Sequence, residues 1–92
     1  MFTVIAFDIV DDRIRYRVVK ALRQYAVRVQ KSVFEAPNLR SNEFQRLKDE
    51  LERLIDLEDD TVRYYFLCGG CVPRIEVSGL GHVTPDEEYK VV

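Results

Sequence analysis

The segment Phe2–Ile9 constrains the fold most, because it is a near-continuous apolar run, FTVIAFDI. A run of this length that contains the β-branched residues Val4 and Ile5 is typical of a central strand covered on both faces. Its charged residue, Asp8, lies between Phe7 and Ile9. A carboxylate among apolar neighbours needs a hydrogen-bond partner or a chemical role. The sequence therefore predicts a central strand that ends at a candidate functional residue, either a cap for the following turn or a metal ligand.

Two amphipathic helices follow this strand. Asp11 and Asp12 supply N-cap chemistry and favourable charge for the first, and Ser41 or Asn42 is expected to cap the second. Apolar residues recur in each at spacings of three and four, which is the pattern of a buried stripe. The stripes are Ile14, Val18, Ala21, Leu22 and Tyr25 in the first helix, and Phe44, Leu47, Leu51, Leu54 and Ile55 in the second.

Three further segments have strand character. Val27–Ala36 is rich in β-branched and aromatic residues, with a kink or tight hairpin expected around Gln30–Ser32. Residues 62–68, VRYYFLC, alternate so that Tyr64 shares a face with Val62 and Phe66, while Tyr65 and Leu67 lie on the other. Arg74–Ser78, RIEVS, is expected to form another short strand.

The order of these elements predicts an α+β fold, a ferredoxin-like βαββαβ sandwich with both helices on one face of the sheet. Residues 1–79 would form this domain. Residues 80–92 would form a C-terminal tail that packs on a partner protomer, with Tyr89, Val91 and Val92 adding an extra strand. An uncovered sheet face bearing Tyr65 and Phe34 predicts a homodimer.

Length and charge limit the possible functions. A chain of 92 residues with 47% hydrophobic and 33% charged residues is expected to be one soluble domain. It shows no secretory leader or membrane span, so a cytoplasmic location is expected.

The net charge of −2 alone argues against a nucleic-acid partner, but the bases are segregated. Residues 13–34 contain no acid, whereas residues 35–60 are mainly acidic. The sequence thus predicts either one surface for a polyanion or two solvated helix faces of opposite sign. The bases of the first segment include Arg13, Arg15, Arg17, Arg28 and Lys31.

Cys68, Cys71 and His82 leave several interpretations open. The CxxC spacing would place four thiols in a dimer, enough for zinc in principle. Cys68 continues the alternation of Tyr64 and Phe66, which favours a buried apolar role for it. His82 lies in the tail and would act as a general base or pack at the surface.

Four segments together resemble the small CRISPR-associated proteins of the Cas2 family. They are FDI at 7–9, DDRIRYRV at 11–18, VRVQKSVFE at 27–35 and EDDTVRYYFL at 58–67. The resemblance implies a ferredoxin-like homodimer that packs sheet against sheet. It also implies a role in CRISPR adaptation (spacer acquisition), a metal-dependent endonuclease activity on RNA or DNA, and partnership with the Cas1 integrase.

The resemblance assigns roles to individual positions. Asp8 would be the catalytic, metal-binding aspartate with Mg²⁺ or Mn²⁺, and Arg15, Arg17 and Arg28 would be functional arginines, with Phe34 as their aromatic neighbour. Arg13 and Lys31 would extend the nucleic-acid surface. Phe7 departs from the family pattern, which usually has a tyrosine there, so any role of that hydroxyl is missing.

Two alternatives to a nuclease remain at the level of sequence. A non-catalytic architectural dimer could bind duplex DNA and bridge the Cas1 integrase. A regulatory domain of the same fold could bind a small ligand, although such a role leaves the segregated arginines unexplained.

Overall fold

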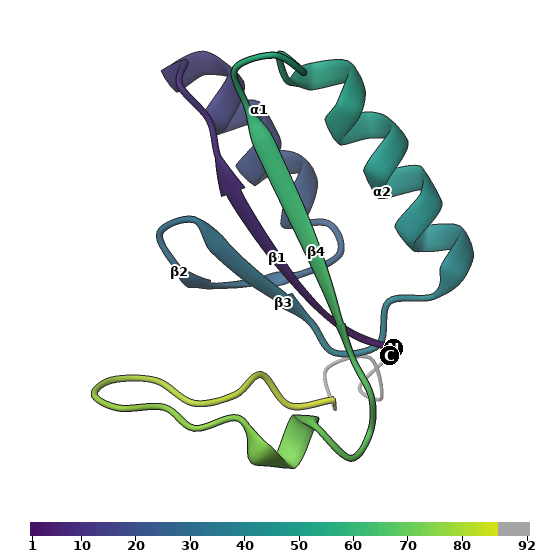
Figure 1. Ribbon diagram of the computed structural model, residues 1–92, viewed down its shortest axis with the longest axis vertical. Coiled ribbons are helices and arrows are strands. Elements are labelled where there is room, and N and C mark those ends of the chain that lie inside the picture. Colours follow the sequence, from purple (N-terminus) through teal and green to yellow (C-terminus); the bar gives the residue numbers. More distant parts are fainter. Residues whose placement is uncertain (87–92) are drawn as a thin grey trace.

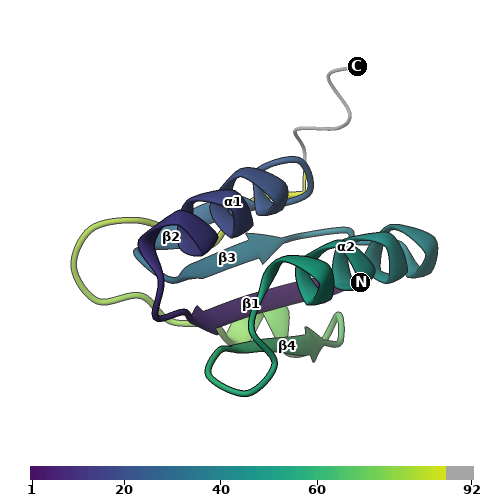
Figure 2. The same ribbon diagram turned by 90° about the horizontal axis from the view of Figure 1, so that it is seen from above.

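The computed structural model describes residues 1–86. Its four strands form one antiparallel sheet in the order β2-β3-β1-β4, and both helices lie on the same side of it (Figures 1 and 2). This arrangement confirms the α+β class and the ferredoxin-like βαββαβ order. The elements are β1 (Phe2–Asp8), α1 (Asp12–Leu22), β2 (Val27–Gln30), β3 (Val33–Ala36), α2 (Ser41–Leu54), β4 (Thr61–Leu67) and a single 3-10 turn, η1 (Val72–Arg74).

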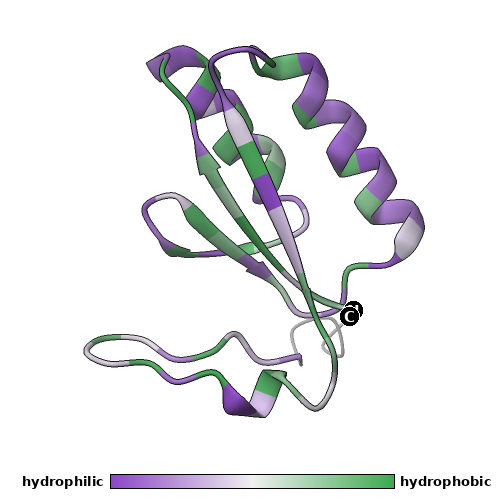
Figure 3. Ribbon diagram, in the orientation of Figure 1, coloured by the Kyte–Doolittle hydropathy of each residue, from purple (hydrophilic) through white to green (hydrophobic). Residues whose placement is uncertain are grey.

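The core lies between the sheet and the two helices. Side chains alternate along a strand, so Thr3, Ile5 and Phe7 of β1 point to the helices, and all three are buried. The predicted stripes of both helices meet them there, and the apolar residues of β1 form a continuous band (Figure 3). The most deeply buried helix residues are Val18, Leu22, Leu47 and Leu51.

The helix-free face of the sheet, here called the open face, differs from the prediction at one residue. Phe34 pairs with Ile5 in the β1–β3 register and is fully buried on the helix side. The expectation that Phe34 lies on the open face is therefore wrong, because directly paired residues share a face. Tyr65, which pairs with Val4, does lie there and is 45% exposed.

The helix starts use carboxylates in two different ways. Asp11 caps α1, since its carboxylate accepts hydrogen bonds from the backbone N–H groups of Arg13 at 2.8 Å and Ile14 at 3.1 Å. The Ile14 and Arg13 donors lower the pKa of Asp11 below its ordinary value. Neither Ser41 nor Asn42 caps α2; the Glu43 carboxylate instead accepts from the N–H of Arg40, at 3.0 Å.

The predicted tight hairpin is confirmed. β2 and β3 are joined by a turn at Lys31 and Ser32, and their register shifts between Arg28 and Gln30. The backbone N–H of Phe7 donates to the Ser32 carbonyl at 3.1 Å. This hydrogen bond places the hairpin turn beside the last residues of β1.

The expected strand at Arg74–Ser78 is wrong. Residues 68–75 form consecutive tight turns that include η1, in which Pro73 removes a backbone donor. The chain therefore turns away from β4 instead of pairing with its free edge. Tyr89, Val91 and Val92, expected to add a strand, lie outside the described residues.

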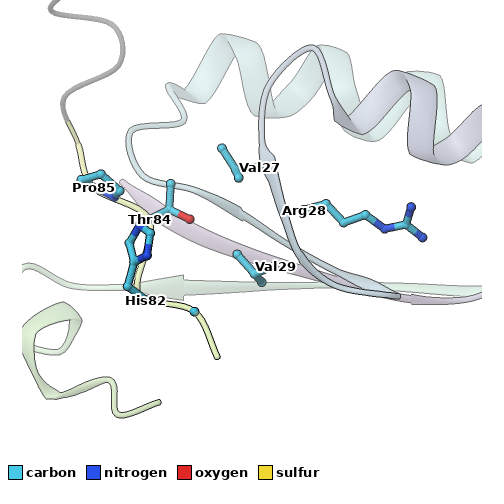
Figure 4. Close-up of a pocket in the computed structure, with 7 residues that line it drawn as sticks. Val27, Arg28, Val29, His82, Thr84 and Pro85 are labelled. Atoms are coloured by element: carbon cyan, nitrogen blue, oxygen red, sulfur yellow. The ribbon is translucent and has the colours of Figure 1, made fainter. Parts of the chain in front are cut away.

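The segment before residue 87 packs on the open face of its own chain. The backbone N–H of Thr84 donates to the Glu35 carboxylate at 2.9 Å, and both residues are buried. His82, Thr84 and Pro85 lie beside Val27 and Val29 of β2 (Figure 4). That residues 80–92 also reach a partner protomer stays a prediction. None of the helices within residues 1–86 combines the length and apolarity needed to cross a membrane.

The Tyr64 hydroxyl supplies a test of the packing between α2 and β4. Its ring meets Phe44 edge to face at 5.1 Å, and the hydroxyl is buried with no hydrogen-bond partner among residues 1–86. Burial, aided by the charge of Glu52, raises the pKa of Tyr64 from 10.0 to about 12. Above about pH 10 the unfolded phenol ionises while the folded one keeps its proton, so this group makes stability fall as pH rises toward 12.

We therefore expect Tyr64→Phe to be at least as stable as the wild type near neutral pH, since it buries no unpaired hydroxyl. It should also lose less stability than the wild type above about pH 10. Urea unfolding of both proteins across this range checks the expectation. If the free energy of unfolding depends on pH in the same way in the wild type and in Tyr64→Phe, the hydroxyl is solvated in the folded protein.

Candidate functional site

Asp8 ends β1 on the open face and is exposed. It pairs with Thr61, the first residue of β4, and shares the face of Ala6 and Val4. Within residues 1–86 its carboxylate makes no hydrogen bond or ion pair. Asp8 is therefore not the cap of the following turn, and its oxygens face solvent.

Asp60 has the structural role considered for Asp8. Its buried carboxylate accepts from the N–H of Val10 at 3.0 Å and from the N–H of Asp56 at 3.0 Å. One side chain thus ties the loop after β1 to the loop before β4. The clamp fixes the strand ends at which Asp8 and Thr61 pair. Sequence reasoning missed it because Asp60 lies within the polar turn LEDDT.

Arg15 also holds the loop that follows Asp8. One guanidinium nitrogen donates to the carbonyl of Ile9 at 2.7 Å and to that of Val10 at 3.3 Å, and the other pairs with Asp12. The guanidinium is thereby anchored at the same end of the sheet as Asp8. A phosphate approaching this end would meet a positive charge that is already oriented.

Arg28 of β2 and Lys31 of the hairpin turn lie toward the same end of the sheet. The Arg28 guanidinium donates to the Lys31 carbonyl at 3.1 and 2.6 Å and lies 5.9 Å from the centre of the Phe34 ring. Phe34 is thus an aromatic neighbour of Arg28 from inside the core. Arg28 points away from the tail residues that cover β2 (Figure 4). Lys31 is exposed at the turn.

A second basic surface runs along the outer side of α1, here called the α1 basic face. Arg13, Tyr16, Arg17 and Lys20 recur at helical spacing and, with Asp12, line a shallow groove of about 520 Å³. Tyr16 is 69% exposed although it is aromatic. The sequence signal for this surface is an aromatic residue between cations, outside the apolar stripe of the helix.

The predicted residues thus form two groups. Asp8, Arg15, Arg28 and Lys31 lie toward one end of the sheet, with Asp8 on the open face and Arg28, which pairs with Phe34, on the helix side. Arg13 and Arg17 lie on the α1 basic face in the helical layer. Arg63 on β4, which pairs with Ala6 on the open face and donates to the Tyr65 hydroxyl at 3.2 Å, was not predicted.

Asp8 suits a divalent cation such as Mg²⁺. Mg²⁺ binds oxygen ligands, uses one or two carboxylates and keeps several waters. An exposed carboxylate with no internal partner supplies such a ligand, whereas the Asp60 oxygens are already taken by backbone donors. Residues 1–86 contain no cluster of three acidic, histidine or cysteine side chains that would hold a metal within one chain. A second protomer would have to supply the other carboxylate.

The cysteines and His82 lie elsewhere. Cys68 and Cys71 are both exposed, in the turn after β4, so the expected buried role of Cys68 is wrong. The strand ends at Leu67, and the chain has left the core before Cys68. His82 lines a hollow of about 350 Å³ against Val27 and Val29 of β2, so it is not part of the group around Asp8.

Comparison with known proteins places this arrangement in a family. The family model described as CRISPR associated protein Cas2 matches residues 1–75. The protein named CRISPR-associated endoribonuclease Cas2 3 from Chloroflexus aurantiacus is 45% identical over 92 residues, covering 100% of this chain and 98% of its own.

Two crystal structures share the fold. That of the hypothetical protein TT1823 from Thermus thermophilus has a TM-score of 0.79 and 36% identity, covering 88% of this chain and 93% of its own. That of Streptococcus pyogenes Cas2 at pH 6.5 has a TM-score of 0.76 and 30% identity, covering 86% and 100%. From the match over most of its length, the chain belongs to the Cas2 family of CRISPR-associated proteins.

Proposed function

We propose that this chain is a metal-dependent endonuclease of CRISPR adaptation that hydrolyses phosphodiester bonds in RNA or DNA, with Asp8 as the metal ligand. The observation that carries the proposal is the exposed Asp8 carboxylate at the end of β1, with the anchored guanidinium groups of Arg15 and Arg28 toward the same end of the sheet. The relative from Chloroflexus aurantiacus is named an endoribonuclease. The activity would be exerted in the cytoplasm.

The proposal requires a homodimer. Tyr65, half-buried Val4 and half-buried Ala6 form an apolar strip on the open face, next to Asp8. Packing this strip against a second copy around a twofold axis would remove it from water. It would also bring the two Asp8 carboxylates toward each other. Like charges in such a pair repel unless a cation or a proton lies between them.

Different residues of the chain would bind the metal ion and the phosphate. The two Asp8 side chains would hold the ion, and Lys31, Arg28 and Arg15 would attract and orient the phosphate at the same end of the sheet. When bound, a divalent ion would supply Lewis-acid activation of the phosphodiester. None of the residues assigned to the site, Asp8, Arg15, Arg28 and Lys31, carries a hydroxyl, thiol or imidazole nucleophile. We therefore infer hydrolysis without a covalent enzyme intermediate.

The direct test is cleavage of labelled single-stranded RNA and duplex DNA by the purified chain in Mg²⁺, Mn²⁺ or EDTA. The proposal predicts cutting of at least one substrate in the presence of a divalent ion and none in EDTA. Cutting that continues in EDTA, or no cutting under any condition, would contradict it. The choice of substrate in this assay also decides between RNA and DNA.

The α1 basic face favours a second candidate function, an architectural dimer that holds duplex DNA and bridges the Cas1 integrase. Arg13, Arg17 and Lys20 lie in the helical layer, whereas Asp8 is on the open face. Binding at α1 therefore does not need the Asp8 carboxylate. Retained duplex affinity without cleavage would favour this candidate over the nuclease.

We expect Arg13→Ala and Arg17→Ala each to weaken nucleic-acid binding and to reduce the slope of log affinity against log salt by about 1, as for the loss of one phosphate contact. Fluorescence anisotropy with a labelled duplex at several salt concentrations measures both quantities. Arg53→Ala is the matched control, because Arg53 is an exposed arginine on the acidic helix α2. If the slope of log affinity against log salt is the same for all three variants and the wild type, the α1 basic face does not contact the nucleic acid.

A further inference from the structure

Two exposed thiols face each other in the turn that follows β4. The Sγ atoms of Cys68 and Cys71 are 3.2 Å apart. A disulfide bond is ~2.05 Å long, so the sulfurs need to approach by only about 1 Å. We propose that Cys68 and Cys71 are a redox-active dithiol that closes reversibly to an intramolecular disulfide.

The backbone of the turn sets up this approach. The Cys68 carbonyl accepts the N–H of Cys71 at 2.9 Å and that of Val72 at 3.2 Å, so the chain doubles back between the two cysteines. An added Cβ at the intervening Gly69 would meet no atom within 4 Å, and at Gly70 the nearest atom to an added Cβ would be the Cys68 Sγ, at 3.9 Å. The turn can therefore adjust without displacing core residues.

The two thiols are chemically unequal. The hydrogen bond between the two thiols, together with the backbone N–H groups of Cys71 and Gly70, lowers the pKa of Cys68 below its ordinary value. The same hydrogen bond raises the pKa of Cys71. Because the thiolate is the nucleophile in thiol–disulfide exchange, Cys68 is the attacking residue and Cys71 the resolving one.

The reaction balances with a low-molecular-weight disulfide such as oxidised glutathione as the oxidant. The Cys68 thiol loses its proton, and the thiolate attacks one glutathione sulfur, forming a mixed disulfide and releasing one glutathione thiolate. Cys71 then loses its proton and attacks the Cys68 Sγ, and the second glutathione thiolate leaves. The protein loses two electrons and two protons, which appear in two molecules of reduced glutathione.

The surroundings favour a disulfide over a zinc site. Tetrahedral zinc needs four ligands, and residues 1–86 bring no third histidine, cysteine or acidic side chain to the two thiols. The turn also lies beyond the far end of β4 from Thr61, the residue paired with Asp8. The dithiol is thus separate from the proposed nuclease site, and its chemistry does not depend on that proposal.

The test is equilibration of the reduced full-length chain in glutathione buffers of increasing oxidised fraction, followed by acid quenching and mass spectrometry. We expect the mass of a single chain to fall by the mass of two hydrogen atoms, with no bound glutathione. This change should reverse in excess reduced glutathione. At neutral pH, iodoacetamide should modify Cys68 faster than Cys71, because a larger fraction of the Cys68 thiol is ionised.

Single variants separate the roles of the two thiols. Cys71→Ser should accumulate a glutathione adduct on Cys68, because the resolving thiol is missing, whereas Cys68→Ser should form its adduct more slowly. Glutathione on both cysteines of the wild type without internal closure would overturn the proposal. Dimers linked by an intermolecular disulfide would also overturn it. So would thiols that resist oxidation only while zinc is bound and become reactive after a chelator is added.

Discussion

Asp8→Ala is expected to reduce metal-dependent cleavage about a thousandfold while leaving the fold intact. The carboxylate has no internal partner among residues 1–86, so its removal breaks no packing or hydrogen bond there. The loss would be that of the ligand for an ion that contributes several kcal/mol of transition-state stabilisation, and ~4 kcal/mol corresponds to about 10³ in rate. Initial rates on the preferred substrate at saturating metal measure the effect.

Asp59→Asn is the matched control for this variant, because Asp59 is an exposed aspartate in the loop before β4. It should cut at the wild-type rate. Duplex affinity should stay nearly unchanged in Asp8→Ala, since the α1 basic face is untouched. Equal cutting by Asp8→Ala and the wild type would assign the activity to another residue or to a contaminating nuclease.

Asp60→Ala is expected to lower the free energy of unfolding by about 2–4 kcal/mol. The substitution leaves two backbone N–H groups, those of Val10 and Asp56, without the buried carboxylate that now accepts from both. Each lost hydrogen bond to a charged group costs about 1.5–3 kcal/mol, and neighbouring losses are not fully additive. Urea unfolding at one fixed protomer concentration measures the change, because dimerisation would make stability depend on concentration.

Asp60→Asn refines this test, because the amide keeps one acceptor oxygen but presents an NH₂ group to the second donor. It should fall between the wild type and Asp60→Ala. Asp59→Asn should stay within about 0.5 kcal/mol of the wild type, as for an exposed position. A change below about 0.5 kcal/mol in Asp60→Ala would mean that water replaces the carboxylate and that the two loops are not clamped.

The layers of the fold could be predicted because their signals are local and periodic. The two helical stripes and the alternation of β4 specify which side faces the core, whereas the near-continuous run Phe2–Asp8 specifies only a central strand. The face of Phe34 could not be predicted from its own segment. Whether a residue of β3 points to the helices depends on its register with β1, a pairing between two strands that α1 and β2 separate in the sequence.

The site was predictable in part for the same reason. Asp8 stands out as a candidate in the sequence because a charge interrupts an apolar run, and its functional role stays a prediction. Asp60 was not, since its partners Val10 and Asp56 belong to different loops and come together only in the folded chain. No strand forms at Arg74–Ser78, because Gly69, Gly70 and Pro73 favour turns that the β-branched residues Ile75 and Val77 do not override.

The proposed sharing of one ion by two Asp8 residues is tested most directly by cleavage with mixed dimers. Wild-type and Asp8→Ala protomers are mixed in varied ratios at constant total protein, allowed to exchange subunits, and assayed in Mg²⁺. If an active site needs one carboxylate from each protomer, the rate should fall with the square of the wild-type fraction. A rate that falls in direct proportion to that fraction would show that each protomer binds its own ion, and would contradict a site shared across the dimer.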